Sequence, residues 1–167
     1  MQFKSTKKDK IELIQRHFTP LIGSEITGYS IAQLWCEENR AWDDWMDLPF
    51  RLHFKDTKLS ISWRKFDELM IEEGEALPFP TTDLQVRWLL NPIKRINGII
   101  GQKLKRVCLS PGHMNIGSHQ CEIWVDLILT TEENQSLVIY NNLDENGLKL
   151  SSNENMLEAA VCCPNPF

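Results

Sequence analysis

Apolar and polar residues alternate regularly through the segment FRLHFKDTKLSISW (50–63), with the letters KDTK in the middle. A period of two places apolar side chains on one face of a β-strand and polar ones on the other. The polar letters between the two alternating runs are typical of a turn. The segment therefore predicts a β-hairpin with one face on a core and one face toward water.

Helical spacing marks three other segments. Apolar residues three to four positions apart predict a helix over residues 11–21, which Pro20 and Gly23 end. Asn91 and Pro92 suit the N-cap and first turn of a second helix. Residues 152–163 predict a last helix, because a serine and a glutamate just before the apolar run are spaced as a capping box.

The chain also repeats itself at an offset of about 78 residues. Residues 21–31 match 99–109 in their apolar frame around a shared Ile-Gly pair, and the strand-like segments that follow match in order: 48–54 with 123–129, 59–63 with 137–141, and 69–71 with 148–150. One unit could scarcely bury both its helix and its sheet alone. The sequence therefore predicts an α+β fold, a single domain (1–167) of two degenerate helix-plus-antiparallel-strand repeats (11–74 and 89–153) that share one core, with a connector at 75–88 and a C-terminal helix at 152–163.

Composition indicates the class of protein and the compartment in which it is expected. The 42% hydrophobic and 25% charged residues are ordinary for a globular protein, and no apolar run is long enough to span a membrane. The five cysteines are odd in number, and the basic N-terminus is not followed by the apolar run of a secretory signal. These features predict a reducing compartment, the cytoplasm, rather than a secreted disulfide framework.

The segment from Trp35 to Asp47 separates the first two strands of the first repeat, where the second repeat has an unrelated sequence. Loops that differ over a common scaffold often carry function. The spacing of its tryptophans would place all three on one face of a short helix. The candidate partner-binding residues are Trp35, Glu37, Glu38, Trp42, Asp43, Asp44, Trp45 and Asp47. Either the rings close the end of a sheet while the carboxylates face water, or an exposed aromatic anchor among carboxylates binds a basic protein.

Evidence for catalysis or metal binding is thin. Cys108, His113, His119 and Cys121 lie within fourteen residues, but their spacing is not that of a zinc site, and thiols beside strands are commonly buried as small apolar groups. No phosphate-binding loop, nucleophile elbow or metalloprotease motif occurs. We therefore predict no catalytic residues, no metal and no cofactor.

Basic residues concentrate in residues 84–121, which contain six lysines and arginines and no carboxylate, although the chain as a whole has a net charge of −5. Such a segment is typically a solvated surface. It also leaves open an RNA-associated protein, although the overall charge disfavours nucleic acid as the main partner.

The segments LPFRLHFKDTKLSISW (48–63) and EIWVDLILTTEENQSLVIYNNLDENGL (122–148) resemble, in strand rhythm and acidic character, small bacterial immunity proteins of polymorphic or contact-dependent toxin systems. The resemblance carries no diagnostic motif and assigns no residue. It implies a non-enzymatic protein that binds one toxin domain, which would be basic. Two alternatives remain open: a small-ligand or regulatory domain with a pocket between the repeats, and an RNA-associated protein using residues 84–121.

Overall fold

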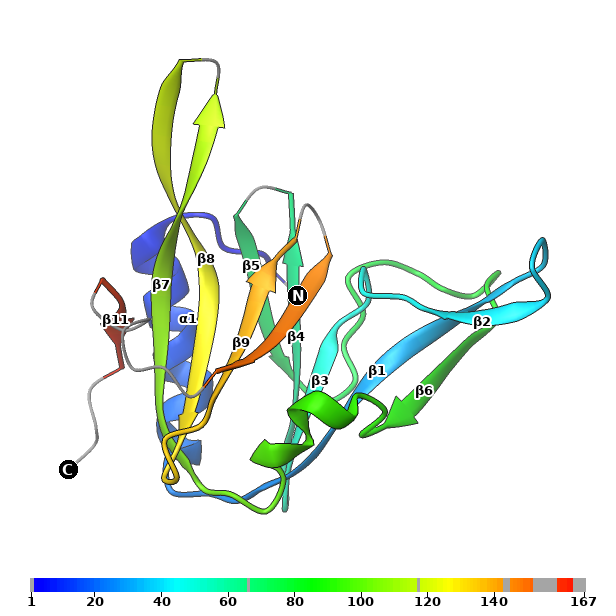
Figure 1. Ribbon diagram of the computed structural model, residues 1–167, viewed down its shortest axis with the longest axis horizontal. Coiled ribbons are helices and arrows are strands. Elements are labelled where there is room, and N and C mark those ends of the chain that lie inside the picture. Colours follow the sequence, from blue (N-terminus) through cyan, green and yellow to red (C-terminus); the bar gives the residue numbers. More distant parts are fainter. Residues whose placement is uncertain (1, 66, 117, 143–144, 152–158, 164–167) are drawn as a thin grey trace.

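Two antiparallel β-sheets make up most of the protein in the computed structural model, which describes residues 2–65, 67–116, 118–142, 145–151 and 159–163 (Figure 1). The first sheet has the order β2-β1-β3-β4-β5, with β6 also paired to β1. Its strands are β1 (Ile26–Cys36), β2 (Ala41–Asp44), β3 (Phe50–Phe54), β4 (Lys58–Arg64), β5 (Glu68–Glu73) and β6 (Val86–Leu90). Both β2 and β6 pair with residues 33–34 of β1, so these two strands lie on opposite edges of β1.

The second sheet has the order β10-β9-β8-β7-β11. Its strands are β7 (Leu104–Ile116), β8 (His119–Thr131), β9 (Ser136–Asn141), β10 (Asn146–Ser151) and β11 (Val161–Cys162). β7 and β8 form a long hairpin that extends past the other strands (Figure 1). A disulfide joins Cys108 on β7 to Cys162 on β11. The bridge differs from the expectation of reduced thiols throughout the chain.

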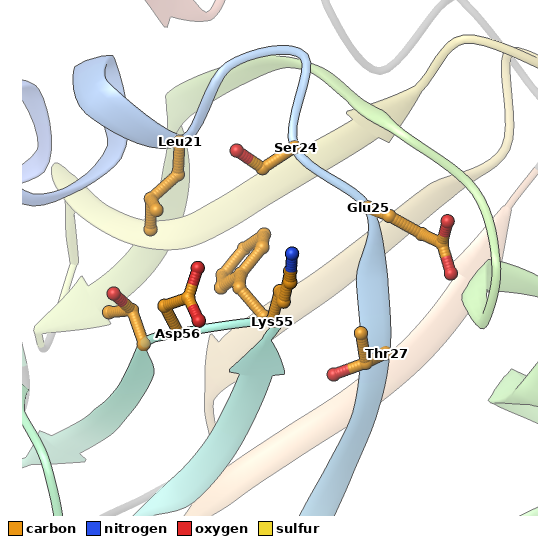
Figure 2. A pocket seen from close by; sticks show the side chains of 8 residues that line it. Leu21, Ser24, Glu25, Thr27, Lys55 and Asp56 are labelled. Carbon is orange, nitrogen blue, oxygen red and sulfur yellow. The ribbon is translucent and has the colours of Figure 1, made fainter.

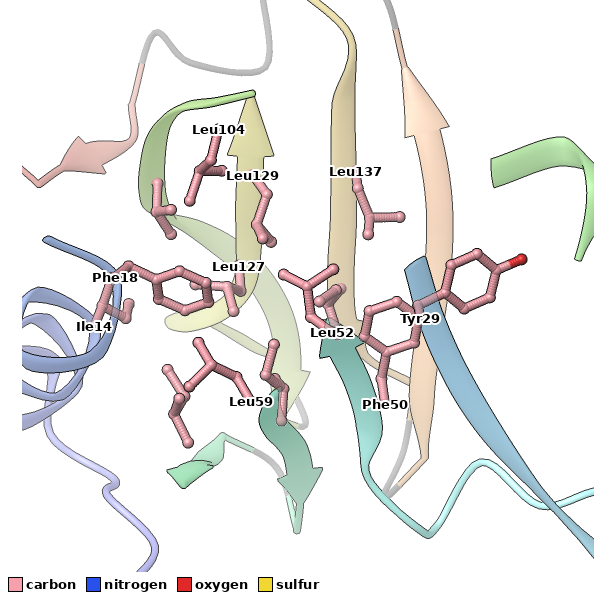
Figure 3. Packing of buried hydrophobic residues seen from close by; sticks show 14 of the residues in the cluster. Ile14, Phe18, Tyr29, Phe50, Leu52, Leu59, Leu104, Leu127, Leu129 and Leu137 are labelled. Atoms are coloured by element: carbon pink, nitrogen blue, oxygen red, sulfur yellow. The ribbon is translucent and has the colours of Figure 1, made fainter. Parts of the chain in front are cut away.

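The apolar faces of the two sheets meet in one core, which the helix α1 (Lys7–Phe18) closes on the side of β5 and β7 (Figure 3). Thr6 caps α1 by accepting the Asp9 N–H at 3.1 Å, and Ile14 and Phe18 face the core. The 3₁₀ turn η1 (Thr19–Leu21) follows directly. Figure 3 shows Phe18 near Leu127 of the second sheet and Tyr29 stacked with Phe50 of the first, their ring centres 5.3 Å apart.

The predicted α+β fold class is wrong, because the protein is mostly antiparallel β-sheet. Residues 89–90, expected in a second helix, belong to β6, and only the six-residue 3₁₀ helix η2 (Lys94–Ile99) follows. Asn91, expected as an N-cap, instead ends β6 in a left-handed conformation at φ 51°. Its side-chain oxygen accepts the Tyr29 N–H at 2.8 Å, which holds the turn against β1.

The predicted C-terminal helix (152–163) is also wrong in the part that can be compared. Residues 152–158 lie outside the described residues, and Val161–Cys162 form strand β11 against β7. The predicted connector (75–88) is too long, because Val86, Arg87 and Trp88 pair with β1. Strand pairing at both places satisfies backbone groups that a helix would have satisfied internally.

The strands that alternation predicted are confirmed. β3 and β4 form the hairpin over residues 50–63, with Phe50 opposite Ile61 and Leu52 opposite Leu59. The segments 69–71 and 148–150 lie in β5 and β10. In sheet order, β1-β3-β4-β5 and β7-β8-β9-β10 follow the same meander. The predicted helix-plus-strand repeats are wrong, since of the two described halves only the first begins with an α-helix. That residues 11–74 and 89–153 arose as copies of one unit is not tested by the shared strand order and stays a prediction.

One buried amide ties the two sheets together. The Asn146 side chain donates to the carbonyls of Met46 at 2.8 Å and Leu48 at 2.9 Å, and accepts the Trp63 N–H at 2.9 Å. The Trp63 indole N–H in turn donates to the Ile139 carbonyl at 3.0 Å. These bonds satisfy polar groups inside the core and fix the chain between β2 and β3.

Candidate functional site

Part of the first sheet projects beyond the second sheet. We call this part the arm and define it as residues 30–47 and 76–90, which comprise most of β1, all of β2 and β6, and the segments that join them. Figure 1 shows β1, β2 and β6 running away from the two-sheet body. The arm contains every candidate partner-binding residue from Trp35 to Asp47. Trp35, Trp42, Asp43 and Asp44 lie on β1 and β2, while the other four lie in the turn between these strands or after β2.

The short helix expected over Trp35–Asp47 is wrong. Residues 37–40 form a turn, with Arg40 at φ 49°, and β2 returns along β1. Trp35 and Trp42 are direct cross-strand partners, so their side chains share one face of the ribbon. Their rings meet edge to face with centres 5.5 Å apart, a favourable geometry for aromatic pairs. Both rings are half-buried and lie outside the buried core.

Trp45 lies on the opposite face of the arm from this pair. Its backbone N–H bonds to the Ala32 carbonyl at 2.9 Å, and its ring packs 5.6 Å from Phe79 of the segment between β5 and β6. Its indole N–H donates to the Asp47 carboxylate at 2.9 Å. Trp45 and Asp47 therefore stabilise the base of the arm, and only two of the three tryptophans share a surface.

A polar network crosses the same face as the Trp35–Trp42 pair. Nε and Nη2 of Arg87 donate to Gln33 Oε1 at 2.9 and 2.6 Å, and Gln33 Nε2 donates to Asp44 Oδ1 at 2.7 Å. The Arg87 guanidinium also lies over the Trp42 ring, 4.4 Å from its centre, a cation–π geometry. The network links β6, β1 and β2 and orients the aromatic pair.

Most of the carboxylates on the arm remain accessible. Glu37, Glu38, Asp43 and Asp44 are exposed and Asp47 is half-buried. With Asp83, the arm has six carboxylates against Arg40 and Arg87, a formal net charge of −4 out of −5 for the whole chain. The rest of the molecule is therefore nearly neutral in formal charge, and the negative potential is concentrated on the arm.

A buried arginine, Arg51 on β3, lies against Trp88 of the arm, although the alternation of the first hairpin predicted Arg51 on the face toward water. Arg51 is only 5% exposed because the Trp88 ring covers it, with the guanidinium carbon 3.3 Å from the ring centre. Its Nη2 donates to the Glu75 carbonyl at 3.2 Å. Burial lowers the pKa of Arg51, and the nearby Glu75 carboxylate opposes that shift. Alternation alone did not reveal this contact, because Trp88 is distant in sequence.

Cys108 and His119, two of the four residues considered for a metal, lie far apart, and the side chains of His113 and Cys121 lie outside the described part of the chain. Cys108 is bonded to Cys162, and it pairs with Ile128 on β8, whereas His119 pairs with Ile116. Eight residues of strand separate the two positions on β7, which is about 26 Å. Among the described residues, no group of three or more histidine, cysteine or acidic side chains is arranged to hold a metal ion.

The largest of the described surface hollows, about 440 Å³, lies between the start of β1 and the β3–β4 turn (Figure 2). Its lining includes the buried apolar residues Leu21 and Phe54 and the exposed charged residues Glu25, Lys55 and Asp56. Each of four such hollows is lined by residues from only one of the two predicted repeats and its flanking segment. None of these four corresponds to the pocket between the repeats that the small-ligand alternative requires.

The basic residues of 84–121 are distributed over three elements. Arg87 lies on the arm, Lys94 and Arg95 on η2, and the others at the start of β7. Arg87 is engaged by Gln33 and Trp42, and Lys105 donates to Asn134 at 2.8 Å. These contacts reduce the number of cations available to phosphate groups, so the RNA alternative gains no support from the geometry.

Within the described residues, no helix is both long and apolar enough to cross a membrane. Comparison with known proteins gave no significant match to a family model, to a curated protein or to a solved structure. The function of this chain is therefore inferred from the arm and its chemistry.

Proposed function

We propose that this chain is a non-enzymatic binding module that uses the arm to bind one basic protein. The partner class that best fits is a basic toxin domain, such as a nuclease, which the bound chain would neutralise in the manner of an immunity protein. The observation that carries the proposal is the half-exposed Trp35–Trp42 pair surrounded by carboxylates on a ribbon that projects from the body.

The chemistry of the arm supports a protein partner in two ways. Its net charge of −4 would attract a basic surface and raise the association rate. Trp35 and Trp42 would then supply the large apolar contact that typically dominates an interface. The cross-strand pairing and the Arg87 stack hold the rings in place before binding, which lowers the entropy lost on association.

The cytoplasm is the compartment proposed from the sequence. The Cys108–Cys162 bridge is more typical of an oxidising compartment. The state of these two thiols in cells therefore tests this part of the proposal separately from the binding function.

Site-specific photocrosslinking in the native cells tests the binding function. A photoreactive phenylalanine analogue in place of Trp42 should give one adduct with a basic protein, because Trp42 lies on the proposed interface. The same analogue at Lys149, an exposed position on β10, is the matched control and should not give that adduct. The adduct protein, expressed alone, should arrest growth, and co-expression of this chain should restore it. Equal crosslinking at both positions, or an adduct to nucleic acid, would contradict the proposal.

A further inference from the structure

Along the outer edge of β6, backbone groups have no hydrogen-bond partner among the described residues. In an antiparallel ladder, alternate residues direct their N–H and C=O groups to the same neighbouring strand. Trp35 donates to the Gln85 carbonyl at 3.0 Å, and Asn91 donates to the Tyr29 carbonyl at 2.9 Å. The N–H and C=O groups of the odd-numbered residues from 85 to 91 therefore point toward β1. The N–H and C=O groups of Val86, Trp88 and Leu90 point away from β1. These outward groups bond to nothing in the part of the chain that the structure describes.

This edge also lacks the protection found at other edges of the same fold. Lys4 pairs with Leu69 and so covers β5, and β11 covers β7. In β6 the single charged side chain, Arg87, is turned toward Gln33 and Trp42. Leu90 is 65% exposed, the largest value among the exposed large apolar residues of the described chain. An uncovered apolar edge strand is a template for pairing with another chain.

We propose that β6 pairs with β6 of a second copy of this chain, in an antiparallel arrangement centred on Trp88. The three outward residues are evenly spaced, so a two-fold axis at Trp88 places Trp88 opposite Trp88 and Val86 opposite Leu90 of the second copy. Every outward N–H and C=O of the three residues then has a partner at once. Such a match needs no change in the register of β6 on β1.

The side chains agree with this pairing. Val86 and Leu90 would form an apolar cross-strand pair that covers the exposed Leu90, and Arg87 would lie opposite Leu89 of the second copy rather than a like charge. The joined ribbon would have the order β2-β1-β6-β6-β1-β2. The two β2 strands would be about 24 Å apart at the usual strand spacing, several Debye lengths at physiological salt, so their carboxylates would repel little. The Trp35–Trp42 surface next to β2 would stay available.

Amide hydrogen exchange measured by NMR at low and high protein concentration tests the pairing directly. In the dilute protein the amides of Val86, Trp88 and Leu90 should exchange rapidly, while those of Arg87 and Leu89 are protected by β1. At high concentration the three outward amides should become protected, and sedimentation should show twice the mass of one chain. A protein that stays monomeric, or outward amides that exchange rapidly at every concentration, would overturn the proposal.

Two variants examine the same surface. Val86→Pro removes an outward N–H that β1 does not use, and should raise the dimer Kd by about ten- to a hundredfold, because two hydrogen bonds are lost across the axis. If the proline variant fails to fold, Leu90→Lys takes its place as the test, and it should also weaken the dimer. Leu84→Lys, which changes another exposed leucine outside β6 (44% exposed), is the matched control and should dimerise as wild type does. A wild-type dimer that neither β6 variant weakens would show that another surface pairs.

The dimer does not depend on the proposed function. If the outward amides become protected only when the crosslinked basic protein is added, the edge binds that partner and the self-pairing proposal is wrong. If dimerisation is found and photocrosslinking at Trp42 fails, the self-pairing stands and the proposed function falls.

Discussion

The guanidinium carbon of Arg87 lies 4.4 Å from the centre of the Trp42 ring, although the two residues belong to strands on opposite edges of β1. The contact therefore links β6 to β2 across β1. The hydrogen bond from Gln33 to Asp44 links β1 to β2 on the same face. The Arg87 contact places a cation beside the aromatic pair without neutralising the arm, whose net charge is −4. The arm is therefore ordered by its own side chains, which suits a surface that must bind without rearrangement.

Trp42→Ala should weaken partner binding much more than folding. The ring is half-buried and outside the core, so its removal should lower the free energy of unfolding by about 1–2 kcal/mol. The matched core variant is Trp63→Ala, which removes a fully buried ring and its bond to Ile139 and should cost about 3–5 kcal/mol. Urea titrations of both variants measure these two losses in the free energy of unfolding. Equal losses would mean that Trp42 belongs to the structural core.

Asn146→Ala should be among the more destabilising polar substitutions. It leaves the Met46 and Leu48 carbonyls and the Trp63 N–H without their buried partner, at a cost of about 2–4 kcal/mol. Asn39→Ala, at an exposed position in the β1–β2 turn, is the control and should change stability little. A small loss for Asn146→Ala, measured by the same titrations, would contradict the role assigned to this amide.

The contribution of Asp126 to stability should fall as the pH rises through the acidic range. Burial raises the pKa of Asp126 to about 6, and the Lys149 cation acts in the opposite direction. The folded chain therefore holds the Asp126 proton more tightly than the unfolded chain, so the stability present below about pH 4 is lost as the pH rises through about 6. The total change is at most about 3 kcal/mol.

The variant Asp126→Asn should flatten this pH profile and increase stability at neutral pH. Lys149→Gln should steepen the profile, because it removes the charge that favours the Asp126 carboxylate. Unfolding free energies measured at a series of pH values check both. An unchanged profile for Asp126→Asn would show that another group is responsible.

Reduction of the Cys108–Cys162 bridge should destabilise the protein. The two cysteines are separated by 54 positions, and opening a loop of this length lowers the free energy of unfolding by about 4 kcal/mol in the chain-entropy model. The melting temperature should fall in reductant and in Cys162→Ser. Cys36→Ser, which alters a free thiol, should keep the wild-type response to reductant. A wild-type melting temperature that reductant does not change would indicate that the bridge does not form in solution.

Local pattern predicted the strands well where alternation dominates. The strands and the pairing of the 50–63 hairpin are correct, because a period of two indicates β-structure. The expectation that one face is toward water is wrong for Arg51, Ser60 and Ser62, which are buried. The register shift between Ser110 and Pro111 interrupts the alternation of the second sheet: Trp124 packs against the main core, whereas Ile128 belongs to a separate buried cluster. Val138 is buried in the same cluster as Ile128, and Ala160 packs against it.

The errors arise where long-range pairing overrides local propensity. Residues 89–90 stand just before the Asn91–Pro92 signal for a helix start, but they form strand hydrogen bonds with β1 instead. The tryptophan spacing of Trp35–Asp47 fits a helix equally well, and only the turn at residues 37–40 makes it a hairpin. The sequence singled out Trp35–Asp47 as the candidate binding segment, and its role in binding stays a prediction. The sequence could not identify Gln33, Arg87 and Trp88, whose roles come from contacts between distant strands.

The most direct test of a basic partner is the salt dependence of association for the charge reversal Asp43→Lys. Asp43 is exposed, so the variant should fold with nearly wild-type stability. With the protein captured at Trp42 as the partner, stopped-flow measurements should show slower association than wild type at low salt, and the difference should shrink as salt is added. Asp56→Lys, an equal charge reversal in the β3–β4 turn, should associate closer to the wild-type rate. Identical rates for wild type and Asp43→Lys at low salt would contradict the assignment of the arm as the surface for a basic partner.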